Sequence, residues 1–328
     1  MTDQPLTIWC NLPMPDEGRR LLIDELAPHR LALPAASAAS VLAAAQSDPL
    51  LLTADIAVGQ PAPADVLAAP RLRWLQISTA GYTRYDTPEF RAAARAKALT
   101  VTNSSAVYDW PCAEHTLAFM LAQSRRLPAA LASVSAAGSA EWNELRDSCR
   151  PLRGQTALIL GYGAIGEQLA ALFVPLGLKT LALRRRPTGR EPLTVTVITA
   201  PALPAALAAA DHVINILPDS PQTRKFMHSA RFAQMKTGAV FYNIGRGSTV
   251  DQEALAAALS AGTLAAAWLD VTEPEPLPVN HPLRRCPNCH VTPHTAGGHH
   301  REVFSIIRHF LDNFNNFTAG RELTNRVM

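Results

Sequence analysis

TALILGYGAIGEQLAALF, residues 156–173, is the stretch that decides the fold. The apolar run 156–160 predicts a buried strand, and the residues after Gly166 predict a helix. Between them stands G-x-G-x-x-G: Gly161 permits a tight turn, Gly163 lets a ligand approach the backbone, and Gly166 allows close packing of the helix. Since a helix N-terminus attracts phosphate, the turn predicts a dinucleotide site. Its expected contact residues are Gly161, Gly163, Ala164, Ile165 and Gly166.

The next strand expected in such a fold, residues 179–183, ends in Arg184, Arg185 and Arg186. A fold that binds NAD usually has a carboxylate here, about 20 residues after the glycines, to accept hydrogen bonds from the ribose hydroxyls. A guanidinium group can only donate, and its fork suits a phosphate. The arginines therefore favour NADP(H), with NAD(H) still possible, and Arg184 and Arg185 are the expected phosphate ligands. The alternative is a solvated basic turn.

Composition excludes several classes of protein. Of 328 residues, 48% are hydrophobic and 17% are charged, which excludes an intrinsically disordered chain. The net charge of +3 gives no reason to expect nucleic acid or an anionic membrane as a partner. We see neither a signal peptide nor a run of about 20 strongly apolar residues, and we expect a cytoplasmic protein.

Short apolar strands alternate with alanine-rich helices, a pattern that predicts an α/β protein with parallel sheets. Strands are expected at 6–9, 51–58, 75–78 and 99–102, then at 156–160, 179–183, 195–198, 213–217, 239–243, 264–269 and 289–292. Helices are expected at 36–46, 62–69, 111–127 and 302–317, the last with its aromatic residues in a core. Because the glycine turn lies near mid-chain, the dinucleotide domain is expected to be inserted within, or preceded by, another α/β unit.

Candidate catalytic residues follow three further predicted strands. Arg246 lies between two glycines, Asp270 is followed by Glu275 in a proline-rich loop, and His294 precedes a pair of glycines. Ligands of open α/β sheets bind at the carboxyl ends of strands. An arginine can bind a carboxylate and polarise a carbonyl, a histidine can exchange a proton near pH 7, and a carboxylate can orient that histidine. With a nicotinamide, this set predicts hydride transfer to and from a 2-oxo acid.

Over residues 75–328 the chain resembles the D-isomer-specific 2-hydroxyacid dehydrogenases. The resemblance rests on AEHTLAFMLAQSRR (113–126), LRGQTALILGYGAIG (152–166), INILPDSPQTRKFM (214–227), NIGRGSTVDQEAL (243–255), LDVTEPEPLP (269–278) and VTPHTAGG (291–298). It implies two Rossmann-like domains with parallel sheets. The NAD(P)-binding domain, residues 103–295, would be inserted into a flavodoxin-like substrate domain formed by residues 1–102 and 296–328. It also implies a homodimer with a dimer arm at about 104–145.

The resemblance also assigns roles to single positions. Arg246 matches the substrate-binding arginine, Glu275 its partner carboxylate and His294 the proton donor. Ala80 and Gly81 match the backbone turn that receives the substrate carboxylate. The residues matched to the cofactor, besides the glycine turn and the arginines, are Leu217, Pro218, Thr223, Ile244, Asp270, His294 and Gly297. The implied reaction is the NADP-preferring reduction of small 2-oxo acids, of the glyoxylate or hydroxypyruvate type, to D-2-hydroxy acids.

Other functions remain open at this point. Formate-type and phosphite-type dehydrogenases share this scaffold, and so do dinucleotide-sensing binding proteins such as corepressors. The sequence also departs from the family at Ser105 and Ala106, where Pro-Gly is common, so the size of the substrate stays open.

A second motif competes for His294. The residues Cys286, Cys289 and His290 spell the C-x-x-C-H of a c-type haem site, and with His294 they could also be drawn as a zinc site. Zinc would consume the proposed proton donor, and haem attachment needs export. We therefore expect no metal here, and we expect His115 and Trp268 to be structural.

Overall fold

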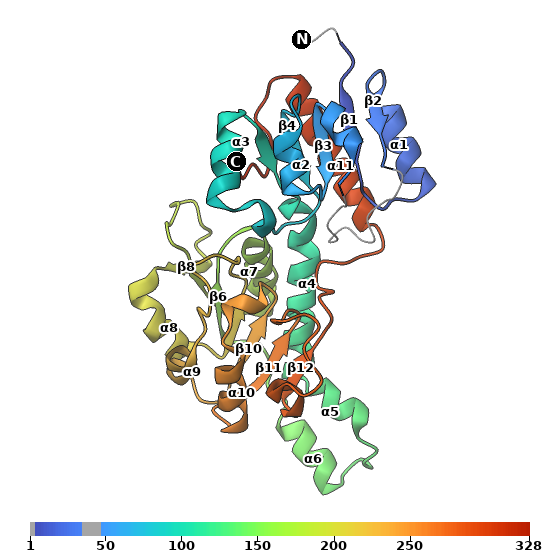
Figure 1. Ribbon diagram of the computed structural model, residues 1–328. Coiled ribbons are helices and arrows are strands. Elements are labelled where there is room, and N and C mark those ends of the chain that lie inside the picture. Colours follow the sequence, from blue (N-terminus) through green and yellow to red (C-terminus); the bar gives the residue numbers. More distant parts are fainter. Residues whose placement is uncertain (1–3, 35–46) are drawn as a thin grey trace. The chain divides into compact units, whose positions relative to one another are not determined.

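The computed structural model describes residues 4–34 and 47–328, which form two compact units. Unit 1 consists of Met1–Tyr108 with His299–Met328, and unit 2 is Asp109–Gly298 (Figure 1). The helix expected at 36–46 lies outside the described residues.

A five-stranded parallel sheet forms the centre of unit 1, in the order β2-β1-β3-β4-β5. This is the flavodoxin-like order. The strands are β1 (Thr7–Cys10), β2 (Arg30–Ala32), β3 (Ile56–Gly59), β4 (Trp74–Ile77) and β5 (Thr100–Thr102). The helices are α1 (Asp16–Leu26), α2 (Pro63–Ala68), α3 (Pro88–Ala96) and the C-terminal α11 (Glu302–Thr318), and α4 (Ser105–Ser124) begins here and continues into unit 2.

Helix α11 completes the core of unit 1, as its aromatic spacing predicted. The fully buried Trp74 ring stacks on Phe310 and Phe317 at centroid distances of 5.3 and 5.4 Å. Its indole N–H donates to Thr102 Oγ1 at 2.8 Å, so the polar end of the ring is satisfied inside the core. The two ends of the chain therefore share one core.

Two predictions for unit 1 and its border need correction, and one strand was not expected. A strand was expected at 51–58, but residues 51–53 belong to a 3₁₀ helix, Pro49–Thr53, because the Asp48 side chain caps the Leu50 N–H and Pro49 stands at the first position. The short strand β2 was not expected. Helix α4 begins at Ser105 and contains Pro111, which was expected to start the helix.

Unit 2 contains a seven-stranded parallel sheet in the order β12-β11-β10-β9-β6-β7-β8, the doubly wound order of dinucleotide-binding folds. The strands are β6 (Thr156–Leu160), β7 (Lys179–Leu183), β8 (Val195–Ile198), β9 (His212–Asn215), β10 (Ala239–Asn243), β11 (Leu264–Leu269) and β12 (Cys289–Val291). The helices are α5 (Leu127–Ala132), α6 (Ala140–Asp147), α7 (Ala164–Leu176), α8 (Leu203–Ala209), α9 (Ser229–Gln234) and α10 (Gln252–Ser260). The two sheets confirm the predicted fold class.

Helices pack on both faces of this sheet. Buried residues of α8, α9 and α10 share one apolar cluster with Ala267 and Leu269 of β11. Trp268 points to the opposite face, where its ring lies 5.0 Å from that of Phe119 in α4. With both faces covered, the carboxyl ends of the strands are where ligands meet this kind of sheet.

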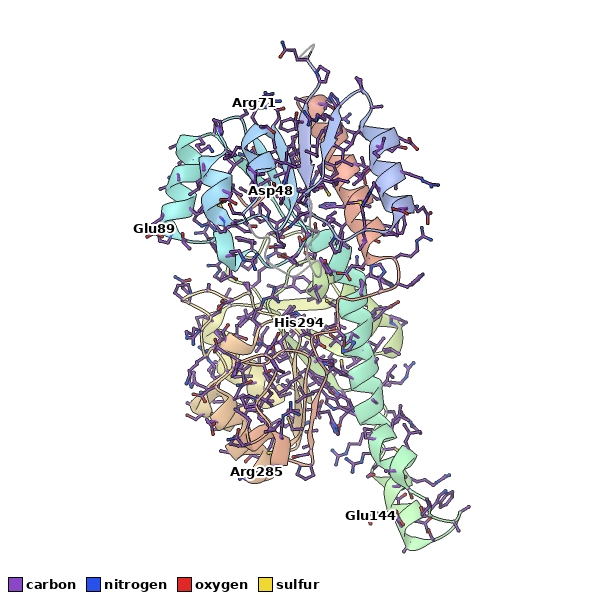
Figure 2. All side chains as sticks on the ribbon, turned by 45° about the vertical axis from the view of Figure 1, so that its right-hand side comes forward. Asp48, Arg71, Glu89, Glu144, Arg285 and His294 are labelled. Carbon is purple, nitrogen blue, oxygen red and sulfur yellow. The ribbon has the colours of Figure 1, made fainter. Side chains whose placement is uncertain are left out.

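Helices α5 and α6 form an arm that extends away from the sheet of unit 2 (Figure 1). Neither helix contains a buried residue, and the side chains of Leu131 and Val134 are almost fully exposed. Figure 2 shows Glu144 near the outer end of this arm, well apart from His294.

Among the described residues, no helix is both long and apolar enough to cross a membrane. In the same part of the chain, no group of three or more His, Cys, Asp and Glu side chains is placed to hold a metal ion, including the set around Cys286.

Candidate active site

In the turn between β6 and α7, each of the three glycines has a different structural role. Gly161 adopts a φ of +98°, and a Cβ there would lie 3.2 Å from the Ile216 carbonyl oxygen. A Cβ on Gly166 would lie 3.0 Å from the Gly161 carbonyl oxygen, so this glycine lets α7 approach the strand. At Gly163, the N-cap of α7, a Cβ would meet nothing within 4 Å. The open space beside Gly163 and the free N–H groups of α7 fit a pyrophosphate.

Arg184 follows β7 as predicted, but two carboxylates flank it. Its Nη1 lies 3.5 Å from Glu167 Oε1 and 3.6 Å from Glu191 Oε1. The same Glu191 oxygen accepts hydrogen bonds from the N–H and the hydroxyl of Thr188, at 2.7 and 2.8 Å. These bonds lower the pKa of Glu191 to about 2. Arg185 is exposed, so the basic turn keeps an excess of positive charge although Arg184 is partly neutralised.

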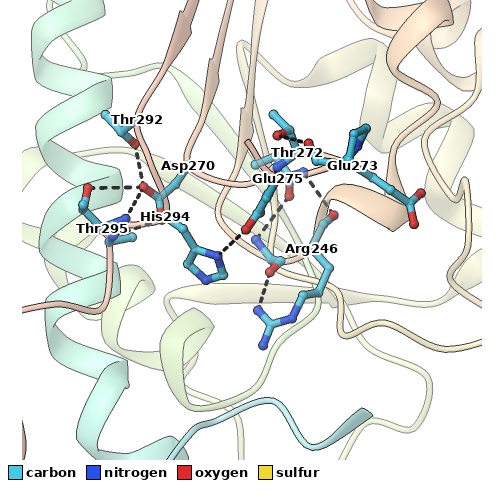
Figure 3. A network of polar contacts seen from close by, with 12 residues as sticks. Arg246, Asp270, Thr272, Glu273, Glu275, Thr292, His294 and Thr295 are labelled. Carbon is cyan, nitrogen blue, oxygen red and sulfur yellow. Dashed lines mark hydrogen bonds and ion pairs between the residues drawn. The ribbon is translucent and has the colours of Figure 1, made fainter. Parts of the chain in front are cut away.

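His294 and Glu275 form a hydrogen-bonded pair. His294 Nδ1 lies 2.8 Å from Glu275 Oε2, while the Thr272 N–H donates to Glu275 Oε1 at 3.1 Å (Figure 3). Burial raises the pKa of the Glu275 carboxyl, but the hydrogen bond from His294, that residue's charge, the Thr272 N–H and the charge of Arg246 outweigh it, and the pKa is lowered. With Nδ1 engaged by Glu275, Nε2 is the nitrogen left for a substrate.

The backbone around His294 is strained and firmly held. His294 has a φ of +53°, in the left-handed region that non-glycine residues rarely adopt. Its N–H donates to the carbonyl oxygens of Asp270 and Thr292, at 2.9 and 3.1 Å. Strain of this kind concentrates at functional sites, where the surrounding structure supports it.

Arg246 stands on a loop after β10 that is packed tightly against the Glu275 loop. Its carbonyl oxygen accepts hydrogen bonds from Asn243 Nδ2 and Thr249 Oγ1, at 3.1 and 2.6 Å. A Cβ on the next residue, Gly247, would lie 2.0 Å from the Thr272 carbonyl carbon, so only glycine fits there. The two loops that carry Arg246 and Glu275 therefore touch backbone to backbone.

Asp270, at the end of β11, is almost fully buried and holds the His294 loop. Its carboxylate accepts from Thr292 Oγ1 at 2.5 Å, from the Thr295 N–H at 2.8 Å and from the Ala296 N–H at 2.9 Å (Figure 3). His115 Nε2 lies 3.8 Å from Asp270 Oδ1. Burial lowers the pKa of His115, and the Asp270 charge acts against that shift.

The structure thus brings Arg246, Asp270, Glu275 and His294 together in one part of unit 2 (Figure 3). The other predicted cofactor residues of unit 2 lie on nearby loops. Leu217 and the buried Ile244 each donate a backbone N–H to Asn215, Thr223 Oγ1 donates to the Pro218 carbonyl oxygen at 2.6 Å, and Gly297 follows the buried Ala296.

The predicted substrate turn belongs to unit 1. The Ala80 carbonyl oxygen accepts from Asn103 Nδ2 at 2.7 Å, and the Gly81 carbonyl oxygen accepts from Thr79 Oγ1 at 2.6 Å. Both carbonyl groups are thereby fixed within the unit.

Sequence reasoning missed two groups of residues. One comprises Thr292, Thr295 and Ala296, which bind Asp270 through a hydroxyl and two backbone N–H groups. The other is the carboxylate pair Glu167 and Glu191 beside Arg184. A possible signal for Glu191 was its place in RRRPTGRE, the first acidic residue after the arginines.

Comparison with known proteins identifies the family of the chain. Residues 117–296 match the model of the D-isomer specific 2-hydroxyacid dehydrogenase NAD binding domain. The chain belongs to this family. The resemblance found in the sequence motifs is therefore confirmed.

Several relatives in this family are glyoxylate/hydroxypyruvate reductases. The human glyoxylate reductase/hydroxypyruvate reductase is 36% identical over 193 residues, 58% of each chain. The chain thus spans less than two thirds of that relative's length. Glyoxylate/hydroxypyruvate reductase B of Citrobacter koseri is 32% identical over 267 residues, which are 79% of this chain and 78% of the relative.

A solved structure covers almost the whole chain. It is a D-isomer specific 2-hydroxyacid dehydrogenase from Xanthobacter autotrophicus Py2 in complex with NADPH and MES. The two chains are 25% identical, with a TM-score of 0.78 and coverage of 99% of this chain and 98% of that one.

Proposed function

We propose that this chain is an NADPH-preferring reductase that converts small 2-oxo acids, such as glyoxylate and hydroxypyruvate, to D-2-hydroxy acids. The observation that carries the proposal is the hydrogen-bonded His294–Glu275 pair, which shares one network with Arg246 and Asp270 at neighbouring strand ends. A proton donor, a carboxylate that orients it and an arginine are the groups that reduction of a 2-oxo acid requires.

Each of these residues has a proposed part in the reaction. Arg246 binds the substrate carboxylate and polarises the neighbouring carbonyl. His294 gives a proton from Nε2 to the carbonyl oxygen, and Glu275 keeps the ring oriented and favours its charged form. The backbone at Ala80 and Gly81 contributes to binding of the carboxylate.

The residues present fit a nicotinamide dinucleotide. Gly161, Gly163 and Gly166 would receive the pyrophosphate at the start of α7, Asp270 the carboxamide, and Arg184 with Arg185 a 2′-phosphate. When bound, this cofactor supplies the hydride that reduces the substrate carbon. NADP preference is supported by the excess of arginine over carboxylate in the turn after β7.

The activity is tested by following NADPH and NADH oxidation with a panel of 2-oxo acids. We expect turnover of glyoxylate or hydroxypyruvate, with a higher kcat/KM for NADPH. The His294→Ala variant should lose turnover while it still binds NADPH, and His300→Ala, which changes an exposed histidine, serves as the matched control. No turnover with any acid and either cofactor would overturn the proposal.

The same assay separates the alternative functions and tests the cofactor preference. Formate and phosphite with NADP⁺ are tested in the oxidative direction. Cofactor-dependent capture of a protein partner without turnover would indicate a binding protein instead. Arg184→Asp should shift preference toward NADH, and an unchanged preference would remove the role given to that arginine.

We also propose that the protein is a homodimer whose α5–α6 arm lies in the interface. The support is the arm's lack of buried residues together with the exposed Leu131 and Val134. Light scattering should show a dimer that Leu131→Glu dissociates. A monomeric wild type would contradict this proposal.

A further inference from the structure

Three segments of unit 2, one of them the Glu275 loop, are tied together by residues that have no part in the functions proposed above. Gln252, the first residue of α10, lies opposite the peptide of Glu273. Its Oε1 accepts from the Glu273 N–H at 3.1 Å, and its Nε2 donates to the Glu273 carbonyl oxygen. One side-chain amide thus binds both polar groups of a single residue in the loop.

The other end of Glu273 is also bound. Its two carboxylate oxygens each lie 3.3 Å from a terminal nitrogen of Arg224. Lys225, the next residue, pairs with Asp251 immediately before Gln252, at 3.2 Å. These contacts join the loop around Arg224, the start of α10 and the Glu275 loop.

These contacts differ in how firmly they hold the Glu275 loop. Arg224 and Glu273 are 58% and 45% exposed, and ion pairs of this kind contribute little. The Gln252 amide acts differently, because its two bonds fix the backbone of Glu273 on both sides of its Cα. Glu275 lies two residues after Glu273, and its carboxylate accepts a hydrogen bond from the Thr272 N–H at 3.1 Å.

We propose that Gln252 is a positioning residue that clamps the Glu273 backbone and thereby holds Glu275 against His294. Gly247 completes the arrangement, since its missing side chain lets the Thr272 backbone lie directly against the Arg246 loop. Gln252 touches none of the reacting groups, and it sets the spacing between Arg246 and Glu275 through backbone contacts. This inference rests on the proposed roles of Glu275 and His294.

Two substitutions test the clamp, with a third as control. Gln252→Ala removes both bonds, whereas Gln252→Glu keeps the acceptor for the Glu273 N–H and loses the donor. Glu253→Ala changes the next residue of the same helix, whose side chain is 73% exposed. We expect kcat to fall about 10-fold in Gln252→Ala, within the range of up to about 100-fold for small displacements of catalytic groups. Gln252→Glu should be intermediate and Glu253→Ala unchanged.

Further kinetic measurements distinguish positioning from general damage. KM for the 2-oxo acid and the Kd for NADPH should change less than about threefold, because the clamp touches neither binding group directly. The acidic limb of the pH dependence of kcat should move to higher pH in Gln252→Ala. The pKa of Glu275 would rise toward its ordinary value once the hydrogen bond from His294 is made less often.

Hydrogen exchange of the unliganded protein provides a readout that does not depend on activity. The Thr272 N–H is diagnostic, because its acceptor is the Glu275 carboxylate and not Gln252 itself. Its exchange should accelerate about 10-fold in Gln252→Ala and be unchanged in Glu253→Ala. Unchanged Thr272 exchange would overturn the clamp even if the wild type reduces no 2-oxo acid. Faster exchange without any wild-type turnover would support the clamp and overturn only the proposed function.

Discussion

Acid should destabilise unit 2 through one buried histidine. His212, at the start of β9, has Nδ1 3.0 Å from the Tyr242 hydroxyl and Nε2 2.9 Å from Gln155 Oε1. The Gln155 amide nitrogen donates to Pro151, so its oxygen faces His212 and can only accept. A neutral ring with the proton on Nε2 therefore satisfies both contacts. Burial lowers the pKa of His212 to about 4, against the charge of Asp211, which acts to raise it.

The loss of stability in acid follows from the difference between the pKa of His212 in the folded and in the unfolded chain. In the unfolded chain the pKa of His212 returns to about its ordinary value of 6.5. Between that value and about 4, the unfolded chain binds more protons, so the free energy of unfolding falls as pH falls. At about 1.4 kcal/mol per pKa unit, the full loss is about 3 kcal/mol, complete below about pH 4 and absent above about pH 7.

Urea unfolding, followed by tryptophan fluorescence from about pH 7.5 down to about pH 4.5, isolates this contribution. His212→Gln removes the titrating ring, so it should be less stable than the wild type at neutral pH. The difference in stability between the two proteins should shrink or reverse by about 2–3 kcal/mol at the acid end. Tyr242→Phe keeps the imidazole and should retain the pH dependence of the wild type. A stability difference between wild type and His212→Gln that is constant over the whole range would refute the reasoning.

Two further substitutions test the packing of the site and its charge. Gly247→Ala places a Cβ 2.0 Å from the Thr272 carbonyl carbon, and we expect a loss of about 1–3 kcal/mol in stability by thermal denaturation. Its kcat should fall up to about 100-fold as the two loops separate, so an alanine variant with wild-type kcat and melting temperature would contradict the packing argument. Glu191→Gln removes one of the carboxylates beside Arg184 and should tighten NADPH binding, measured by fluorescence titration, by up to about fivefold. NADH binding serves as the control there, and equal changes for both cofactors would exclude an effect on the 2′-phosphate.

The sequence predicted the site best at positions where few other residue types could replace the one present. Gly161 and Gly166 predict the turn because Gly161 adopts a positive φ and a Cβ at either position would lie unusually close to a backbone carbonyl oxygen. Arg246 and His294 could be placed near each other because both follow strands of one parallel sheet. In these cases the local sequence pattern, together with the rule that ligands bind at the carboxyl ends of parallel strands, was enough to predict the positions of the residues.

Other features depend on contacts that the sequence does not display. Gln252 looks like an ordinary residue in the first turn of a helix, and only tertiary structure brings it opposite the Glu273 backbone. Thr295 and Ala296 bind Asp270 through backbone N–H groups, which every non-proline residue possesses. Position, and not residue type, decides these contacts.

The buried carboxylate of Asp270 shows that the residues of the site depend on one another. Its oxygens are occupied by donors on both sides of His294, at Thr292, Thr295 and Ala296, and these bonds hold His294 in its strained conformation. Releasing the loop would let the His294 ring leave Glu275, so Asp270, proposed to bind the cofactor, would also keep the proposed proton donor in place. Loss of activity on changing Asp270 would therefore not by itself locate the cofactor. Separate measurement of cofactor affinity and of kcat would assign the two proposed roles, because loss of the loop would lower kcat and loss of the proposed carboxamide contact would weaken binding of the cofactor.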